Sequence, residues 1–427
     1  MKILVINYFY PPVIRAHAYR WQQLARYWAG QGAEVEVITA RVAGQPDCED
    51  DHGVRVCRSG LVAHSSADAG VVTEVSARQS WKSRVVSAVL NMLRPVYRKV
   101  YWPDAVYHWL PFLFFQLWKR RHKKYDVIVS YYPMFESLIG GWLWMRMNRN
   151  GDTRWIVDYG DPFSISDSQQ PNNYAIYRKL NFFVERSVLR SASAVVMLQD
   201  NLAARYLAAG LVEREKLHVI PHVVDIDSFY AGEASGVREN KKEIRVVYVG
   251  ALHKDIREPG KLDLLFKQLN LDDSRQKIVL DMFGRTGGID VHWSDVPQIR
   301  HYGLVSREEA SRQMSGADVL LIIGNDNCDM VPSKLTEYVA TGRAIISLQG
   351  NAPGDESIKR YAKYGRVMEI DKHDPSSWDV DSIRHFIEQS AGTVSGREVI
   401  DQVLSGYHVR GVAEAYLRVA GLSAFVS

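Results

Sequence analysis

The segment from Asp329 to Leu348, DMVPSKLTEYVATGRAIISL, carries the residues best suited to chemistry. Pro332 and Ser333 predict the start of a helix, because proline fits the first helical turn and serine can cap free N–H groups. These N–H groups and the positive end of the helix dipole attract phosphate, and Lys334 adds a cation. Glu337 lies one turn further along the same face, where its carboxylate can accept hydrogen bonds from two ribose hydroxyls. The segment therefore predicts a site for a phosphorylated ribose.

Two aspartates follow another predicted strand. They lie in the segment WIVDYGDPF, Trp155 to Phe163. Ligands of open α/β sheets bind at the carboxyl ends of strands, so Asp158 and Asp161 can bind an acceptor hydroxyl, and one of them can act as a base. The alternative is that Asp161 only caps the turn before Pro162. A carboxylate pair also suits a glycosidase, but a glycosidase needs no phosphate-and-ribose site.

The composition of the chain limits the number of domains and the classes of function. The chain has 427 residues, which is enough for two or three domains. Its 53 lysines and arginines stand against 49 aspartates and glutamates, and the resulting net charge of +4 does not favour nucleic acid binding. The sequence has no Cys-x-x-Cys spacing, and no Asp-x-Asp pair lies beside a predicted strand. Neither of these patterns of a metal site is therefore present. We therefore expect metal independence and no cofactor.

The cysteines and the apolar segments indicate the cellular compartment of the protein. Cys48, Cys57 and Cys328 are too few for a disulfide framework and are odd in number, which favours a reducing compartment. The opening MKILVINYFYPP lacks the long apolar region and cleavage site of a signal peptide. No apolar run reaches the ~20 residues of a membrane helix. We expect a cytoplasmic protein.

The segment of residues 81–124 combines cations with aromatic side chains. Ten lysines and arginines stand against Asp104 alone, so the local charge is ten minus one, or +9. Ten tryptophans, tyrosines and phenylalanines are interspersed among them. This composition favours contact with an anionic membrane surface. The alternative is that the aromatic residues are core and the cations form a solvated rim.

The sequence around these segments predicts two similar halves of the chain. In each half, short apolar runs alternate with stretches of helical spacing, which predicts a mostly parallel α/β sheet. The polar segment of residues 231–243, AGEASGVRENKKE, predicts a linker between the halves. The predicted strands are Ile3–Asn7, Val35–Thr39, Val127–Ser130, Trp155–Val157, Ala194–Leu198, His218–Ile220, Arg245–Val249, Ile278–Phe283, Val319–Ile323 and Ala344–Leu348.

Taken together in chain order, these segments resemble those of a known family, the GT-B glycosyltransferases of the family 4 type. The family's Pro-x-Lys-x-x-Glu-Tyr helix start, followed by Ala-x-Gly, is matched from Pro332 to Gly342, with Arg343-Ala344 in place of the usual Lys/Arg-Pro. MKILVINYFYPP, VIPHVVDIDSF and VVYVGALHKDIREPG resemble three further family segments, and the resemblance covers most of the chain. It implies an α/β GT-B fold, two Rossmann-like domains facing a central cleft.

The resemblance also implies roles for individual residues. Lys334 and a cation in the loop after Gly250 would stabilise the departing diphosphate, and Arg257 is favoured over Lys254 by its spacing from Pro259. Asp329 stands where the family often has the first of two glutamates. The implied donor-binding residues are Lys254, Gly284, Leu304, Val305, Asp329, Pro332, Ser333, Lys334, Leu335 and Glu337, and the catalytic set is Asp158, Asp161, Arg257 and Lys334.

The loop after the first strand departs from the family. Two glycines that usually let the backbone approach a phosphate are absent, and Val13 to His17 stand in their place. Arg15 and His17 are the candidates to replace that approach with side-chain contacts to phosphate or acceptor.

These observations give one expected function and two alternatives. We expect a retaining, metal-independent transfer of a sugar from a nucleoside-diphosphate sugar, first of all a UDP-sugar, to a lipid-linked or growing surface glycan such as O-antigen or capsule. The enzyme would be peripheral on the inner face of the membrane. The alternatives are an enzyme with a soluble acceptor, and a non-catalytic scaffold or nucleotide-sugar sensor. The expected domains are 1–235 for the acceptor, 241–405 for the donor, and a helix in 406–427 that packs on the first domain.

Overall fold

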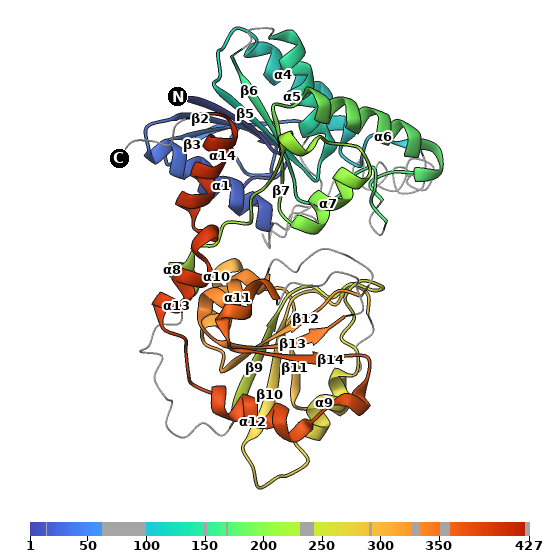
Figure 1. The fold of residues 1–427 in the computed structure, drawn as a ribbon, viewed down its shortest axis with the longest axis vertical. Coiled ribbons are helices and arrows are strands. Elements are labelled where there is room, and N and C mark those ends of the chain that lie inside the picture. Colours follow the sequence, from blue (N-terminus) through green and yellow to red (C-terminus); the bar gives the residue numbers. More distant parts are fainter. Residues whose placement is uncertain are drawn as a thin grey trace, which may run out of the picture. The chain divides into compact units, whose positions relative to one another are not determined.

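The computed structural model describes residues 1–13, 15–61, 100–148, 152–167, 170–230, 243–289, 293–326, 334–350 and 359–422. The chain forms two compact units. Unit 1 comprises Met1–Val223 and Val409–Ser427, and unit 2 comprises Val224–His408. Figure 1 shows each unit as a central sheet with helices on both faces. The prediction of two mostly parallel α/β halves is confirmed.

The sheet of unit 1 has eight strands. All neighbours are parallel except β3 and β4, which form an antiparallel pair at one edge. The inner strands are mostly apolar and are buried beyond their first residue, because helices cover both of their faces. Across the sheet the order is β3 (Cys48–Asp51), β4 (Val54–Ser59), β2 (Glu34–Ala40), β1 (Lys2–Ile6), β5 (Val127–Tyr132), β6 (Arg154–Tyr159), β7 (Ala194–Met197) and β8 (Leu217–Val219).

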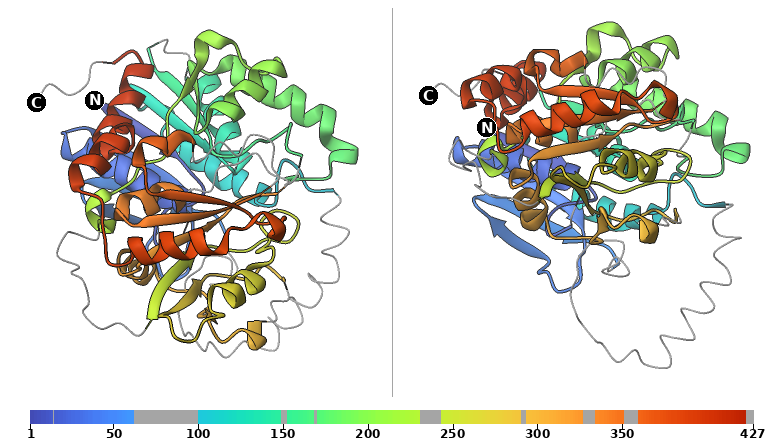
Figure 2. Two further views of the ribbon diagram at one scale, coloured as in Figure 1. Left: turned by 60° about the horizontal axis from the view of Figure 1, so that its bottom comes forward. Right: turned by 90° about the horizontal axis from the view of Figure 1, so that it is seen from below.

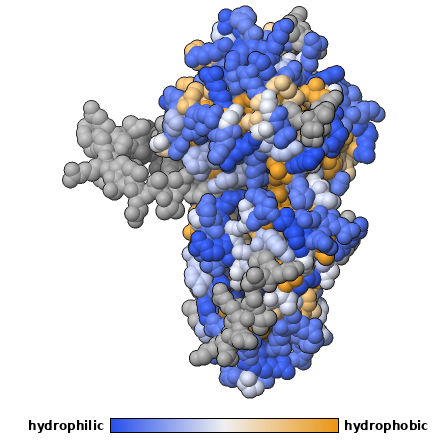
Figure 3. Space-filling view, turned by 90° about the vertical axis from the view of Figure 1, so that its left-hand side faces the viewer, coloured by the Kyte–Doolittle hydropathy of each residue, from blue (hydrophilic) through white to orange (hydrophobic). Residues whose placement is uncertain are grey.

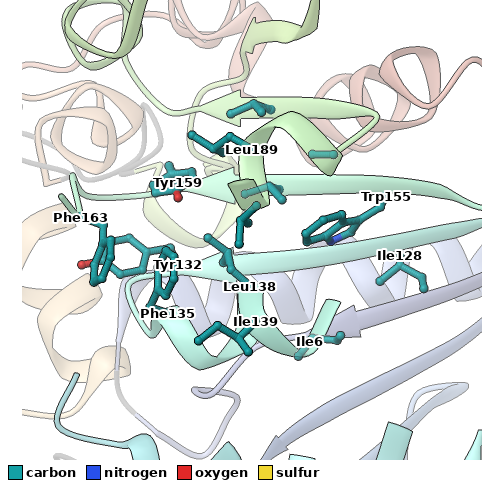
Figure 4. Close-up of a cluster of buried hydrophobic side chains, with 14 of the residues drawn as sticks. Ile6, Ile128, Tyr132, Phe135, Leu138, Ile139, Trp155, Tyr159, Phe163 and Leu189 are labelled. Atoms are coloured by element: carbon teal, nitrogen blue, oxygen red, sulfur yellow. The ribbon is translucent and has the colours of Figure 1, made fainter. Parts of the chain in front are cut away.

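Two hydrophobic clusters fill the two sides of this sheet. On one side Trp21 and Trp28 of α1 (Ala16–Gly30) pack against Tyr416 of α14 (Val409–Val419), so the red C-terminal helix lies beside the blue N-terminal segment in Figures 1 and 2. On the other side, Figure 4 shows Phe135 and Phe163 among the buried side chains. Their rings are stacked, with centroids 3.9 Å apart. The helices of unit 1 are α1 (Ala16–Gly30), α4 (Leu110–Lys119), α5 (Phe135–Met147), α6 (Tyr174–Ser191), α7 (Asp200–Ala208) and α14 (Val409–Val419).

Unit 2 has a six-stranded, fully parallel sheet. Its order is β11 (Ile299–His301), β10 (Lys277–Phe283), β9 (Glu243–Val249), β12 (Val319–Ile323), β13 (Ala344–Gln349) and β14 (Val367–Asp371). One cluster packs under α9 (Leu262–Leu269) and α12 (Val380–Ser390), and another lies under α10 (Arg307–Ser315) and α11 (Lys334–Thr341). The helices are α8 (Ile226–Phe229), α9 (Leu262–Leu269), α10 (Arg307–Ser315), α11 (Lys334–Thr341), α12 (Val380–Ser390) and α13 (Arg397–Val403).

The unit boundary lies before the expected position at residue 235. Val224, Ile226 and Phe229 are buried in the core of unit 2, so the chain enters that unit directly after Val223. The chain returns to unit 1 at Val409, where α14 begins. The expected linker at residues 231–243 falls outside the described residues except for its last residue.

The strand order reverses once in each sheet. In unit 1 the reversal is at β1, which lies between β2 and β5, and in unit 2 it is at β9, which lies between β10 and β12. Ligands of open α/β sheets bind at the carboxyl ends of the strands at such points. The loops after β1, β5, β9 and β12 are therefore where a site is expected.

Within the described parts of the chain, no helix is long and apolar enough to span a membrane.

Candidate functional site

The first described turn of α11 carries the predicted lysine and glutamate. Lys334 Nζ donates a hydrogen bond to Glu337 Oε2 at 2.5 Å, and Arg307 Nη2 lies 3.9 Å from Glu337 Oε1. The Glu337 side chain is mostly buried, whereas that of Lys334 is about one-third exposed. Two cations thus face one carboxylate. Anionic ligand oxygens can engage Lys334 while hydroxyl groups approach Glu337.

A buried tyrosine fixes α11 to the end of β9. The Tyr338 hydroxyl accepts a hydrogen bond from Val249 N at 2.8 Å and lies 3.3 Å from Val249 O, to which it donates. The helix that carries Lys334 is thereby tied to the strand that precedes the Gly250 loop. Leu335 points into the core, so only its backbone can meet a ligand.

The structure distinguishes between the two candidate cations in the loop after β9, Arg257 and Lys254. Arg257 Nε donates to Asn325 Oδ1 at 2.9 Å, at the carboxyl end of β12, and the Arg257 backbone bridges to His253. Lys254 is exposed on the same loop. Because Arg257 is held at the point where the strand order reverses, the geometry favours it over Lys254 for contact with a phosphate.

A buried lysine that the sequence reasoning missed ties these loops together. Lys372 Nζ donates to Gly324 O at 2.9 Å, to Glu258 O at 3.1 Å and to Asp326 Oδ2 at 2.7 Å. Burial lowers the pKa of the Lys372 ammonium. Burial acts to raise the pKa of Asp326, but hydrogen bonds from Lys372 and His373 outweigh it and hold that pKa below its usual value. Nothing in the sequence marks Lys372, since a lysine after a strand usually points to solvent.

Gly284 brings the loop after β10 against the loop after β9. A Cβ atom at Gly284 would lie 1.9 Å from Gly250 O, so no larger residue fits there. Gly284 N donates to Gly303 O, and the next residue, Leu304, is 45% exposed. Val305 packs partly against the core. The predicted Gly284, Leu304 and Val305 therefore lie together at the carboxyl ends of β10 and β11.

Three predicted donor-binding residues, Asp329, Pro332 and Ser333, lie outside the described residues. So do residues 81–99 of the cationic aromatic segment. The remainder of that segment includes α4.

In unit 1 the structure argues against direct chemistry by Asp158. Its side chain is completely buried, Tyr416 donates to its Oδ2 at 2.9 Å, and Arg20 Nη2 lies 3.7 Å away. Burial raises the pKa of Asp158 to about 6 despite the charge of Arg20. An acceptor hydroxyl cannot reach this carboxylate. Asp158 instead links β6 to α1 and to the C-terminal helix, a role that the strand-end position alone could not distinguish.

Asp161 is placed differently. It follows Gly160 beyond the end of β6 and is only half-buried. Burial raises the pKa of this carboxylate to about 6. A carboxylate with that pKa, near the carboxyl end of the sheet, is suited to accept a proton near neutral pH.

His17 follows the loop after β1, and His222 follows β8; both are neutral imidazoles. The His17 ring stacks on Tyr131 with centroids 5.4 Å apart, and its Nε2 is buried without a hydrogen-bond partner among the described residues. Burial lowers the pKa of both histidines to about 3, and the charge of Arg20 adds to this for His222. Arg15 is exposed, with its guanidinium 4.4 Å from the ring centroid of Phe9. His222 lies in the segment VIPHVVDIDSF, and the sequence pattern assigned it no role.

Metal independence stays a prediction. His218 and His222 are four residues apart, but His218 lies on strand β8 and not on a helix. No group of three or more metal-ligating side chains converges among the described residues.

Part of the cationic aromatic segment is core and part is exposed. Trp109, Leu113 and Leu117 are buried, whereas the opposite side of α4 exposes Phe112, Phe114, Phe115 and Trp118. Lys119 lies over the Phe115 ring at 4.3 Å, and Arg121 lies over the Trp118 ring at 4.7 Å. By contrast, the face of the molecule in Figure 3 is mainly hydrophilic.

A second exposed apolar row, not predicted, lies on α6. It comprises Ile176, Leu180 and Phe183, which is 69% exposed. Their spacing of four and three residues places them on one face of the helix. Arg178, Lys179 and Arg186 are interspersed along the same helix.

Comparisons with known proteins agree with this architecture. Residues 16–222 match the model of the glycosyl transferase 4-like domain. No curated protein matches the sequence. Among solved structures, an α,α-trehalose-phosphate synthase (UDP-forming) from Burkholderia xenovorans is similar at a TM-score of 0.58 and 11% identity, with 98% of this chain and 99% of that chain covered. A glycosyltransferase from Rickettsia africae gives 0.56 and 10%, covering 98% and 97%.

The catalytic domain of starch synthase IV from Arabidopsis thaliana, bound to ADP and acarbose, gives a TM-score of 0.56 at 10% identity and covers 99% of both chains. At such low identities these likenesses establish the fold, and the site rests on the geometry described above.

Proposed function

We propose that this chain moves a sugar from a nucleoside-diphosphate sugar to an acceptor hydroxyl, because residues 16–222 match the model of the glycosyl transferase 4-like domain and the chain has the GT-B fold. We propose a UDP-sugar as donor, retention of anomeric configuration and no metal. The observation that carries the proposal is the Lys334–Glu337 pair on the first described turn of α11, fixed to the end of β9.

The donor half of the proposal follows from charge. Breaking the bond between sugar and diphosphate builds negative charge on the leaving group, and cations placed in advance stabilise it. Lys334 and Arg257 are the cations proposed for this task. When the donor binds, Lys334 would contact the phosphate in place of Glu337. Glu337 would then accept hydrogen bonds from the ribose hydroxyls. Lys372 would position the loop that carries Arg257.

The acceptor half rests on unit 1. Asp161 is proposed to hold the acceptor hydroxyl and to accept its proton, because its carboxylate ionises near neutral pH. The neutral His17, whose Nε2 has no hydrogen-bond partner within the described ranges, is proposed as a further hydrogen-bond acceptor for the same ligand. Retention would follow if the acceptor entered on the face that the diphosphate leaves, without a covalent intermediate.

We further propose that the acceptor is lipid-linked and that unit 1 docks on an anionic membrane, on its inner face in the cell. The exposed aromatic side chains of α4 are flanked by Lys119 and Arg121, and this combination suits the interface of anionic lipids. Such an acceptor fits the assembly of a surface glycan such as O-antigen or capsule.

The test is nucleotide release and sugar transfer with a panel of UDP-, GDP- and dTDP-sugars, using a lipid extract as acceptor source. The proposal expects one donor to release its nucleoside diphosphate and to label a lipid fraction, with NMR showing an unchanged anomeric configuration. Glu337→Ala and Lys334→Ala should abolish both signals. Nucleotide binding without transfer to any acceptor would favour the alternative of a non-catalytic sensor, and labelling of a water-soluble product only would overturn the lipid-linked acceptor.

A further inference from the structure

Two cysteines face each other across the edge of the first sheet. The antiparallel register of β3 and β4 pairs Cys48 with Cys57. The adjacent pair is hydrogen-bonded, since Arg58 N donates to Asp47 O at 2.7 Å. Hydrogen-bonded and non-hydrogen-bonded pairs alternate along an antiparallel ladder, so Cys48 and Cys57 form a non-hydrogen-bonded pair. In such pairs the Cα atoms lie about 4.5 Å apart and the side chains are closest. This spacing falls within the range of about 4.4–6.8 Å that a disulfide requires.

The sulfur atoms already touch. Cys48 Sγ lies 3.3 Å from Cys57 Sγ, and both cysteines are free thiols. Cys48 is exposed, whereas Cys57 is buried. A soluble reagent can therefore reach the first sulfur, and the second is in place to attack it.

The surroundings of the pair connect it to other elements of unit 1. Arg120, which follows α4, donates from Nη2 to Cys57 Sγ at 3.0 Å and from Nε to Glu36 Oε2 at 2.7 Å. On β3, Asp51 accepts hydrogen bonds from Tyr10 in the loop after β1 and from Gln22 on α1. A covalent link from β3 to β4 would restrain the edge strand that holds this loop and this helix.

We propose that Cys48 and Cys57 form a reversible disulfide by exchange with a low-molecular-weight disulfide such as oxidised glutathione. The Cys48 thiolate attacks one sulfur of the reagent, which releases one glutathione thiol and leaves a mixed disulfide. The Cys57 thiolate then attacks Cys48 Sγ and releases the second glutathione thiol. Two electrons and two protons pass from the protein to the reagent. The proposal does not depend on the transferase function.

The test is carried out on the full chain with Cys328→Ser, which removes the third cysteine. The protein is equilibrated with mixtures of reduced and oxidised glutathione at mildly alkaline pH, because burial and the contact with Cys57 raise the pKa of the Cys48 thiol. Acid quenching, alkylation with N-ethylmaleimide and intact-mass measurement then count the free thiols. Cys48→Ser and Cys57→Ser, each on the same background, are the matched controls.

The expected product is two hydrogen atoms lighter than the reduced protein, takes up no alkylating reagent and returns to two free thiols on addition of dithiothreitol. Its melting temperature should exceed that of the reduced protein, because the link restrains the unfolded chain. Each single-serine control should show at most one glutathione adduct. The proposal is overturned if both thiols of the parent still react with N-ethylmaleimide at every ratio of reduced to oxidised glutathione. It is also overturned if the parent accumulates only a glutathione adduct.

Discussion

Tyr338 on α11 and Val249 at the end of β9 are joined by two hydrogen bonds through a single buried hydroxyl group. This contact sets the distance between Lys334 on the helix and the Gly250 loop after the strand. The proposed donor site is therefore built on two regular elements and not on loops alone, which is how a rigid binding geometry is usually obtained.

Tyr338→Phe tests this connection. The change leaves the Val249 N–H and C=O without their partner in the core, and we expect the free energy of unfolding to fall by about 1–3 kcal/mol. Nucleotide affinity should fall as well, because α11 loses its anchor. Urea denaturation and a nucleotide titration measure the two effects. Tyr361→Phe, which alters another buried hydroxyl contact in unit 2, is the comparison, and an equal loss of nucleotide affinity there would contradict a specific role for Tyr338.

The pH dependence of activity should identify Asp161. Burial raises its pKa to about 6, so the base is protonated below that pH and ionised above it. We expect kcat/KM to rise with pH through about 6. Asp161→Asn should remove this limb and lower kcat/KM by about 100-fold or more, as loss of a general base does. An unchanged pH profile in a variant with the parental melting temperature would assign the acceptor proton to another group.

The dependence of stability on pH should reveal a different carboxyl pair. Glu136, in the first turn of α5, is completely buried next to Asp104, and burial followed by the charge of Asp104 raises the pKa of Glu136 well above its ordinary value. A group whose pKa is higher in the folded state contributes stability below its unfolded pKa, and this contribution is lost as the pH rises. Glu136→Gln should therefore stabilise the protein at pH 8 relative to the parent, with the advantage shrinking toward pH 4. Urea denaturation at both pH values measures it, and a variant that is less stable at pH 8 would contradict the neutral form of Glu136.

Much of this architecture follows from apolar patterning. The strands from Ile3, Val319 and Ala344 are continuous apolar runs, and they appear as β1, β12 and β13 within a residue or two of the predicted ends. β3 escaped prediction because its sequence, CEDD, has no apolar residue other than Cys48 and owes its pairing to the register with β4. β11 and β14 are edge strands whose polar residues hide the same pattern.

The site was less predictable from sequence than the fold. Lys334 and Glu337 could be proposed because Pro332 and Ser333 predict a helix start, and helical spacing then puts the two residues on one face. Asp158 and Asp161 have the same strand-end signature, and only the packing of Tyr416 and Arg20 from distant parts of the chain shows that Asp158 is internal. Lys372 could not be found, since its three acceptors come from two other loops of unit 2.

The exposed aromatic residues of α4 predict binding to lipid. Phe115→Ser combined with Trp118→Ser should weaken binding to phosphatidylglycerol vesicles by roughly tenfold or more, because each aromatic side chain contributes about 1.5–3 kcal/mol when it is buried. Binding to phosphatidylcholine vesicles should be weak, and salt should reduce binding to the anionic ones. Co-sedimentation measures this, with Leu271→Ser, an exposed leucine of unit 2, as the matched control. Equal binding by parent and double variant would show that α4 is not the docking surface.

The donor site itself is tested most directly by isothermal titration of UDP, GDP and dTDP into the parent, Lys334→Met and Glu337→Gln. Each variant removes one charge and keeps the approximate size of its side chain, and thermal melting verifies that each is folded. We predict that one nucleoside diphosphate binds the parent and that each variant weakens it by roughly 10- to 100-fold, since a hydrogen bond to a charged group is worth about 1.5–3 kcal/mol. Absence of binding by every nucleoside diphosphate, or undiminished binding by both variants, would contradict a donor site on α11.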